Sequence, residues 1–410
     1  MKRAKSNDAA AEATTAGLRI RVLPSITDVP AAAWDACANP GGPGERPALP
    51  YNPFIAHGFL SSLEISGSAV AQAGWQPQHL VLEDETGAVL GVAPCYLKSH
   101  SRGEYVFDRG WAEAYERAGG DYYPKLQVSV PFTPATGRRL LVAPGARCGE
   151  SEAALAQGLV ELCRLREASS VHVTFMPEPE WHFLAERGFL KRTDQQFHWE
   201  NAGYASFDEF LGALASRKRK VLKRERREAL ANGIEVDWLT GSDLTEAVWD
   251  DFFAFYMDTG SRKWGRPYLT REFFSLVSEK MADRILLVMA RRAGRYIAGA
   301  INFIGSETLF GRHWGAIEHH PFLHFELCYY QAIDFAIANK LLRVEAGAQG
   351  EHKIARGYMP VTTYSAHYIA DPALRRAIAD YLVRERAYVE AAGRELADLA
   401  PFRSEALEDQ

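Results

Sequence analysis

One pattern of strands and helices repeats along this chain, and this repeat constrains the fold more than any other feature. Residues 78–97 and 284–305 each show two apolar runs separated by a turn, which contains Gly87 in the first copy and Gly294 in the second. A further strand candidate follows each hairpin, and then one helix and one more strand. These last two elements are predicted at 151–168 and 171–176 in the first copy, and at 325–340 and 341–348 in the second. A repeat of this length indicates two copies of one mixed α/β domain and not a solenoid of short units.

Helical periodicity marks the start and the end of the second copy. In 247–259 the apolar residues Val248, Phe252, Phe255 and Tyr256 fall at i, i+4, i+7 and i+8, which places them on one helix face. A second helix is predicted at 272–281 and a C-terminal helix at about 372–396. With 410 residues the chain exceeds the size of one ordinary core, so two domains are expected.

The predicted organisation is therefore an α+β chain of two tandem domains, each a mixed and mostly antiparallel sheet flanked by helices. We predict a disordered tail at 1–17, a first domain at 18–200, a second domain at 201–396 and a tail at 397–410. The first 17 residues are polar and lack an apolar core segment, which argues against a secretory signal. Five scattered cysteines without a C-x-x-C pair fit reduced thiols, and a cytoplasmic location is expected.

A strongly basic helix is predicted at 206–232, inside a chain whose formal net charge is −5. Four of its cations share one helix face, namely Arg217, Lys220, Arg224 and Arg227. Such a stripe can neutralise several phosphates of a polyanion. The alternative is a solvated helix face, on which Glu225 and Glu228 are expected to form i, i+3 or i, i+4 pairs with neighbouring cations.

Three stretches give the chain a family resemblance: the basic helix and following strand at 206–238, NPFIAHGFLSSLE at 52–64, and GAQGEHKIARGYMPVTTYSAHYI at 347–369. The repeated order of elements is similar to that of the GNAT acyltransferases. Together with these stretches it resembles the FemAB-like proteins of that superfamily, the peptidoglycan biosynthesis/recognition group. The resemblance implies transfer of an amino acid from aminoacyl-tRNA to an amine on a peptidoglycan precursor. It also implies a basic helix at the entry to the second unit and a loop lysine, here Lys353.

Acyl transfer to an amine requires a neutral amine, a stabilised oxyanion, a protonated leaving group and two substrates held together. The loop that follows the last strand of the second copy is dense in glycine and polar residues, and it is the predicted site. Lys353 is the candidate for stabilising negative charge or for holding a phosphate, and the alternative is a solvated lysine. Glu345 and His367 are candidate bases, and Tyr364 is a candidate proton donor. For Glu345 the alternative is an ion pair near Arg343, and for His367 and Tyr364 it is packing.

Further residues near this loop and on the strand at 308–316 are candidates for substrate contact. They are His313, Trp314, Gln349, His352, Arg356 and Tyr358. Aromatic packing is the competing interpretation for Tyr358. No metal site is predicted, because Pro321 separates His320 from His324 and no cysteine or aspartate cluster accompanies them.

The sequence allows two classes of acyl donor, acyl-CoA and aminoacyl-tRNA. Acetyl-CoA enzymes of this superfamily hold pyrophosphate on a glycine-rich loop at a helix start. The corresponding stretch, GAIEHHPFLHFE, lacks the glycines and the arginine of that loop. We therefore predict an acyltransferase that forms an amide bond on an amine acceptor, with aminoacyl-tRNA favoured over acyl-CoA as the co-substrate. The alternative is a non-catalytic module that binds a cell-wall or peptide ligand.

Overall fold

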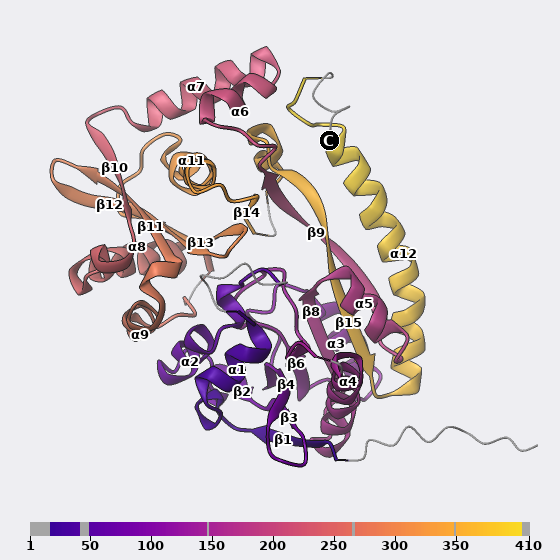
Figure 1. Cartoon of the computed structure of the whole chain (residues 1–410). Helices are drawn as coiled ribbons and strands as arrows, with labels where there is room; N and C mark the ends of the chain where they lie inside the picture. The colour runs from indigo at the N-terminus through magenta and orange to yellow at the C-terminus, as the bar shows by residue number, and fades with distance from the viewer. Residues whose placement is uncertain (1–16, 42–48, 146, 265–266, 348–349, 404–410) are drawn as a thin grey trace, which may run out of the picture.

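An eleven-stranded sheet runs through both halves of the chain in the computed structural model (Figure 1), which describes residues 17–41, 49–145, 147–264, 267–347 and 350–403. Its strand order is β10-β11-β12-β13-β14-β9-β15-β8-β6-β5-β2. A second sheet of four strands, in the order β1-β3-β4-β7, belongs to the first half.

The strands of the first half are β1 (Arg19–Leu23), β2 (Trp75–Pro77), β3 (His79–Glu83), β4 (Val89–Ala93), β5 (Cys95–Lys98), β6 (Lys125–Val128), β7 (Leu141–Val142), β8 (Ser170–Met176) and β9 (Leu190–Glu200). Those of the second half are β10 (Ile234–Leu239), β11 (Ile285–Arg292), β12 (Arg295–Ile304), β13 (Thr308–Ala316), β14 (Arg343–Glu345) and β15 (Met359–Ile369).

The helices of the first half are α1 (Ala31–Ala38), α2 (His57–Ile65), α3 (Arg109–Arg117), α4 (Cys148–Leu165) and α5 (Glu178–Ala185), with 3-10 turns η1 (Ile26–Asp28), η2 (Pro53–Ile55) and η3 (Ala71–Ala73). Those of the second half are α6 (Phe207–Ala213), α7 (Ser216–Ala229), α8 (Glu246–Trp264), α9 (Arg271–Met281), α10 (Leu323–Phe325), the π-helix η6 (Glu326–Tyr330), α11 (Gln331–Ala338) and α12 (Pro372–Ala397). The second half also has the 3-10 turns η4 (Gly241–Asp243), η5 (Ala282–Arg284) and η7 (Glu351–Arg356).

The predicted repeat is present in the topology of the two halves. Each half has an antiparallel hairpin, β3–β4 in the first and β11–β12 in the second. Each also has one parallel strand pair that encloses a helical crossover: β6 and β8 enclose α4, and β13 and β14 enclose the continuous α10, η6 and α11. Parallel neighbours need such a crossover, so the α+β class and the repeated unit are both confirmed.

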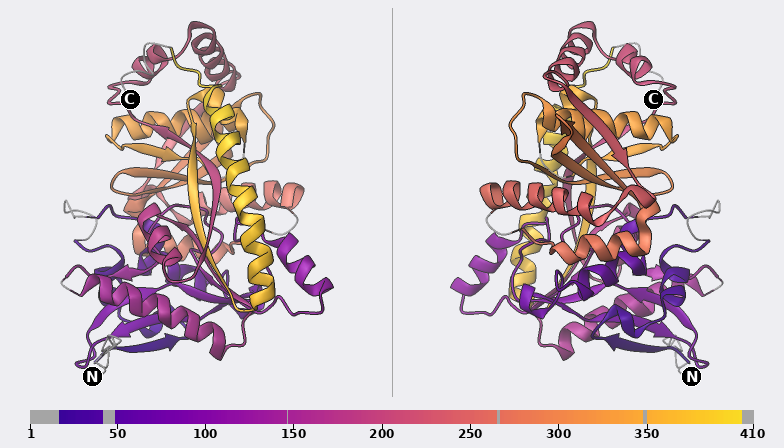
Figure 2. Two further views of the ribbon diagram at one scale, coloured as in Figure 1. Left: turned by 90° about the vertical axis from the view of Figure 1, so that its right-hand side faces the viewer. Right: turned by 90° about the vertical axis from the view of Figure 1, so that its left-hand side faces the viewer.

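Two long strands join the halves into one sheet. Strand β9 ends the first half and pairs with β14 of the second, whereas β15 returns from the second half to pair with β8 and β9. In Figures 1 and 2 these two strands form a twisted ribbon along which α12 lies. The predicted division after residue 200 coincides with the end of β9, and it remains a prediction because β15 crosses back over it.

An apolar cluster also spans the two halves. Phe54 and Phe59 of the first half pack on Phe303 of the second, with ring centroids 5.1 and 5.2 Å apart, and Phe54 also contacts Phe310 at 5.1 Å. All four rings are buried. Full burial of one such side chain is worth about 1.5–3 kcal/mol, so this contact holds the halves together firmly.

The predicted basic helix at 206–232 is in fact two helices, α6 and α7, and this corrects the prediction. The chain leaves helical geometry at Leu214, whose backbone is extended and which forms a bridge with Phe402. Ala215 donates its N–H to the carbonyl of Pro401. Part of the predicted tail at 397–410 is therefore packed structure, because Pro401 and Phe402 pair with the backbone that links α6 to α7.

Candidate active site

The strands β13 and β14 separate at one end, and this separation creates the site. They pair only over Thr308–Phe310 and Arg343–Glu345, after which β13 continues to Ala316 and β14 ends. The chain then enters η7, which Gly350 and Gly357 flank with φ values of 109° and 88°. Those backbone angles are ones that glycine adopts readily, so the sequence allows the tight return that brings Lys353 to the end of β14.

Lys353 is a buried lysine without a carboxylate partner. Its side chain is 3% exposed, and Nζ donates to the carbonyl oxygens of Ala346 at 2.6 Å and Gly347 at 3.0 Å. No ion pair links it to a carboxylate within the part of the chain that the structure describes. Burial lowers the pKa of the Lys353 ammonium group to about 8. The amine is therefore held in place by backbone dipoles, while its charge remains uncompensated.

Glu345 lies at the last position of β14 and faces the first half. Its Oε2 accepts from the backbone N–H of Thr136 at 3.4 Å and lies 3.9 Å from Nε2 of His198, which opposes it across the β14–β9 ladder. Burial raises the pKa of the Glu345 carboxyl to about 7 and lowers the pKa of His198 to about 3. Glu345 can therefore exchange a proton near neutral pH, whereas His198 stays neutral.

Aromatic side chains surround the other side of the strand separation. Trp314 of β13 contacts His324 with ring centroids 5.2 Å apart, and Tyr329 donates or accepts a hydrogen bond with His352 at 3.0 Å. A groove of about 530 Å³ opens here, lined by residues that include Trp314, Phe322, His324 and Phe325. The predicted contact residue Trp314 lines this groove, and His352 and Arg356 both pack on Phe325, another of its lining residues.

The structure separates two predicted catalytic residues from this region, which corrects their grouping. His367 and Tyr364 lie on the part of β15 that pairs with β8 of the first half. His367 lies eight positions along the strand from Met359, about 26 Å at 3.3 Å per residue. His367 is fully buried, with Nδ1 2.7 Å from Nδ1 of His172. An alternating strand pattern does not reveal which half of the sheet a strand joins.

Other predicted contact residues also occupy different surroundings from those expected. Tyr358 is fully buried, and its hydroxyl donates to the carbonyl of Tyr329, so packing explains it and substrate contact does not. His313 packs on Tyr256 of α8, and burial lowers its pKa to about 3. Gln349 lies outside the described residues.

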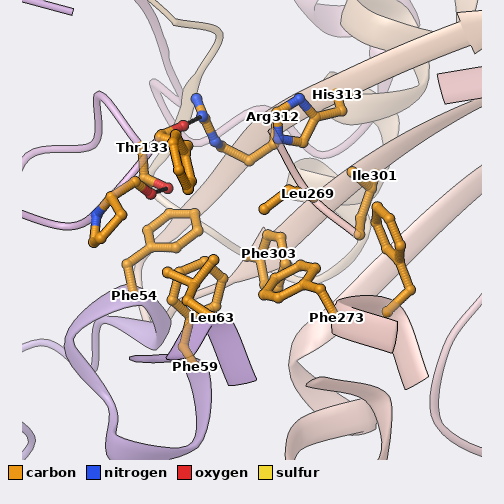
Figure 3. Close-up of a pocket in the computed structure, with 13 residues that line it drawn as sticks. Phe54, Phe59, Leu63, Thr133, Leu269, Phe273, Ile301, Phe303, Arg312 and His313 are labelled. Atoms are coloured by element: carbon orange, nitrogen blue, oxygen red, sulfur yellow. Dashed lines mark hydrogen bonds between the residues drawn. The ribbon is translucent and has the colours of Figure 1, made fainter. Parts of the chain in front are cut away.

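Figure 3 shows the cavity beside His313, where phenylalanine rings from both halves converge. Its free space is about 10 Å³, which is room for about one water molecule. Arg312 reaches the edge of this cavity and donates to the carbonyl of Phe132. The closed packing excludes this seam as a substrate pocket in the described conformation.

The basic stripe has the predicted geometry. Arg217, Lys220, Arg224 and Arg227 are all exposed on α7. Glu228 pairs with Arg224 at 3.7 Å, as on a solvated helix.

The acidic residue Glu225 differs from the prediction. It is buried and pairs with Arg356 at 2.8 Å instead of with neighbours on its own helix. This partner lies 131 residues away in the sequence, so local spacing gave no signal for it.

Two other residues of the site were not singled out in the sequence. His198 opposes Glu345, and Thr136 donates to it, but both come from the first half. Only the long-range β9–β14 pairing brings them there.

Two tandem units, each with a parallel strand pair around a helix, define a tandem GNAT-like protein. The chain belongs to the FemAB-like family, described as peptidoglycan biosynthesis/recognition, whose model matches residues 25–404. No curated protein matches the sequence.

Among solved structures, the chain is similar to FemX, with 11% identity, a TM-score of 0.50, and coverage of 88% of this chain and 100% of FemX. It is also similar to L-PGS from Bacillus licheniformis, at 7% identity and a TM-score of 0.48, over 78% of this chain and 95% of that one. A tandem GNAT protein from the clavulanic acid biosynthesis pathway matches at 16% identity and a TM-score of 0.42, over 87% and 99%. At these identities the likeness to FemX establishes the fold.

Among the residues that the structure describes, none of the helices combines the length and apolar character that a membrane span requires.

Proposed function

We propose that this protein is an N-acyltransferase that forms an amide bond on an amine acceptor. The observation that carries the proposal is Lys353, a buried cation at the separated ends of β13 and β14. Two of its three ammonium hydrogens are directed to the carbonyls of Ala346 and Gly347, so one remains for a substrate. A cation without a neutralising carboxylate is well suited to stabilise an oxyanion.

The proposed reaction uses Glu345 and Lys353 in different roles. The neutral amine of the acceptor attacks the carbonyl carbon of the acyl donor, and Lys353 stabilises the negative charge that develops on the carbonyl oxygen. The new C–N bond forms while the bond between the acyl carbon and the carrier breaks. The amine loses one proton to Glu345, whose raised pKa of about 7 suits a general base. The protonated Glu345 carboxyl then passes this proton to the leaving group, so that the carrier leaves protonated and Glu345 returns to its starting state.

We propose aminoacyl-tRNA as the donor and a peptidoglycan-type precursor as the acceptor. Membership in the FemAB-like family supports the acceptor class. The exposed stripe of Arg217, Lys220, Arg224 and Arg227 supports a polyanionic donor, because its cations share one helix face. Acyl-CoA is the competing donor. A cytoplasmic location accords with this proposal, since charged tRNA and acyl-CoA are both cytoplasmic.

The experiment is a donor screen with the purified full chain. Radiolabelled aminoacyl-tRNA and radiolabelled acetyl-CoA are each incubated with a UDP-linked muramyl-peptide acceptor, and amide products are identified by mass spectrometry. The proposal predicts an amide product with aminoacyl-tRNA and little with acetyl-CoA. Product from acetyl-CoA alone would assign the competing donor. Acceptor binding without product from either donor would support a binding module and overturn the proposal.

A further inference from the structure

A second groove lies between the basic helix and the loop that carries Lys353. It has a volume of about 330 Å³ and is lined by Arg217, Lys218, Val221, Leu222, Glu225, Ala355 and Arg356. The first five residues belong to α7, and the last two belong to η7. The groove therefore connects the surface of α7 with the short element on which Lys353 lies.

An ion pair forms one wall of this groove. Arg356 donates from Nη2 to both carboxylate oxygens of Glu225, at 2.9 and 2.8 Å, and Tyr330 donates its hydroxyl to the same carboxylate. The guanidinium group also stacks on Phe325, 3.5 Å from the ring centroid. Arg356 is consequently fixed in position before any ligand arrives.

One donor of this fixed arginine is unused. Arg356 is 6% exposed, and its Nε has no hydrogen-bond partner. A buried N–H of a cation without an acceptor costs free energy, and an anion bound in the groove that Arg356 lines would offer it an acceptor.

The charges around the groove favour an anionic ligand. Arg217, Lys218 and Arg356 contribute three positive charges, and Glu225 contributes one negative charge. Arg217 and Lys218 form no ion pair with any carboxylate of the described chain, whereas Lys223 on the same helix pairs with Asp208 at 3.1 Å. Two cations with free donors and one with an unused N–H suit the oxygens of a phosphate group.

We infer that this groove is a phosphate-binding subsite for the acyl donor. Arg217 and Lys218 hold the phosphate from α7, and Arg356 holds it from η7. Because Arg356 and Lys353 share η7, an occupied groove restrains the loop that presents Lys353. The inference rests on the proposed function, and it adds the place where the phosphate of the donor lies.

Two donors offer this chemistry, a phosphodiester of RNA and the pyrophosphate of CoA, and the test separates them. Binding of a single-stranded RNA tetranucleotide and of CoA is measured by titration calorimetry at low salt. Lys218→Gln is the test variant because Lys218 lines the groove but is not part of the exposed stripe. Arg219→Gln is the matched control, since it removes the same charge from the next residue, outside the groove.

The expected result is a loss of about tenfold in affinity for one probe in Lys218→Gln, with a change of less than about twofold in Arg219→Gln, because only a groove cation contacts the phosphate directly. The affected probe identifies the source of the phosphate. Equal losses of affinity in both variants would show that the probe is attracted by the positive charge of α7 in general and not by the groove, which would overturn the inference. Unchanged binding in Lys218→Gln, or no binding of either probe to the wild type, would also overturn it.

Hydrogen exchange provides a second measurement that does not depend on catalysis. In the wild type, the bound probe is expected to slow amide exchange at 351–357, and this protection is expected to disappear in Lys218→Gln. Failure of the proposed function gives a different pattern, since transfer would then be absent with every donor while the groove still binds its probe. Transfer that proceeds normally in Lys218→Gln would contradict the subsite alone.

Discussion

Lys125 in the first half and Lys353 in the second are both buried, but their surroundings differ. A third buried lysine, Lys98, lies 3.8 Å from Glu104, which also pairs with Lys125. Lys125 lies at the start of β6, fully buried, and its Nζ donates to Glu104 at 2.6 Å, to Asp108 and to Ser101 at 2.8 Å. These two carboxylates raise its pKa above the usual value despite burial. The hydrogen bonds of the Lys353 ammonium group go to backbone carbonyls, and burial lowers its pKa to about 8.

The difference supports the proposal that the second half carries the chemistry. A buried cation that is matched by carboxylates has no charge left for a substrate, and removing one partner mainly costs stability. A buried cation without a carboxylate costs stability where it stands, and such groups gather at functional sites. The first copy also fills its own strand separation, since the N–H of Gly137 donates to the carbonyl of Phe175 and Arg139 donates to that of Thr174. We therefore propose that the first half has a structural role and that the second half carries the catalysis.

The largest expected effect is on stability and concerns the first half. Lys125→Met leaves two buried carboxylates without their cation, so the free energy of unfolding should fall by about 3–5 kcal/mol. Urea denaturation measures it, and the exposed Lys280→Met is the control, with an expected change within about 0.5 kcal/mol. The rate of transfer per folded molecule should be unchanged by Lys125→Met. A lower rate of transfer per folded molecule in Lys125→Met would indicate that the first half takes part in the chemistry as well.

The next effect concerns Glu345 and the pH dependence of transfer. Glu345 must lose its proton to act as a base, so the rate should rise as the pH passes through about 7. Lys353 must keep its proton to act as a cation, so the rate should fall above about pH 8. Glu345→Gln should lower the rate about 10²-fold and remove the lower limb of the profile. A Glu345→Gln profile that keeps this limb would assign it to another group.

The same two pKa values predict opposite trends in stability. Because the folded pKa of Glu345 is raised, its stabilising contribution is complete below the unfolded value of 4.5 and is lost as pH rises to about 7. Because the folded pKa of Lys353 is lowered, stability is gained as pH rises from about 8 towards 10.5. Comparing the urea midpoints of Glu345→Gln and the wild type between pH 5 and pH 7.5 isolates the first trend. Parallel curves would show that Glu345 titrates normally.

The smallest effect concerns the exposed stripe. Changing Arg224 and Arg227 to Gln should flatten the log–log dependence of tRNA binding on salt by about 2, since each phosphate contact contributes about −0.9 to the slope. Filter binding between low and physiological salt measures it. The control replaces Lys223 and Arg226, which are already paired with carboxylates. An equal slope in the wild type and the stripe variant would leave these arginines as a solvated surface.

Local patterns predicted the repeated units well because hairpins and amphipathic helices are encoded by neighbouring residues. The prediction of a helix at 372–396 is confirmed by α12, Pro372–Ala397. Lys353 was reached through the family resemblance, and the structure adds its burial and its backbone contacts.

The rest depended on contacts between distant residues. Glu225 was expected to pair within its own helix, but no cation stands three or four residues from it in the sequence, and its partner is the remote Arg356. The residues around His367 show the alternating pattern of a strand of the second half, but β15 places His367 beside His172 of the first half. In both cases the pairing of remote segments decides the surroundings, and neither propensity nor spacing records it.

The most direct test of this account compares transfer by Lys353→Met with transfer by Lys125→Met, both corrected for the folded fraction. The measurement is the single-turnover rate with the donor that the screen identifies, and Lys353→Arg tests whether the charge alone suffices. The account predicts a loss of about 10²-fold or more for Lys353→Met, the scale of a lost oxyanion contact, and no loss for Lys125→Met. An unchanged rate in folded Lys353→Met would contradict the assignment of chemistry to the second half.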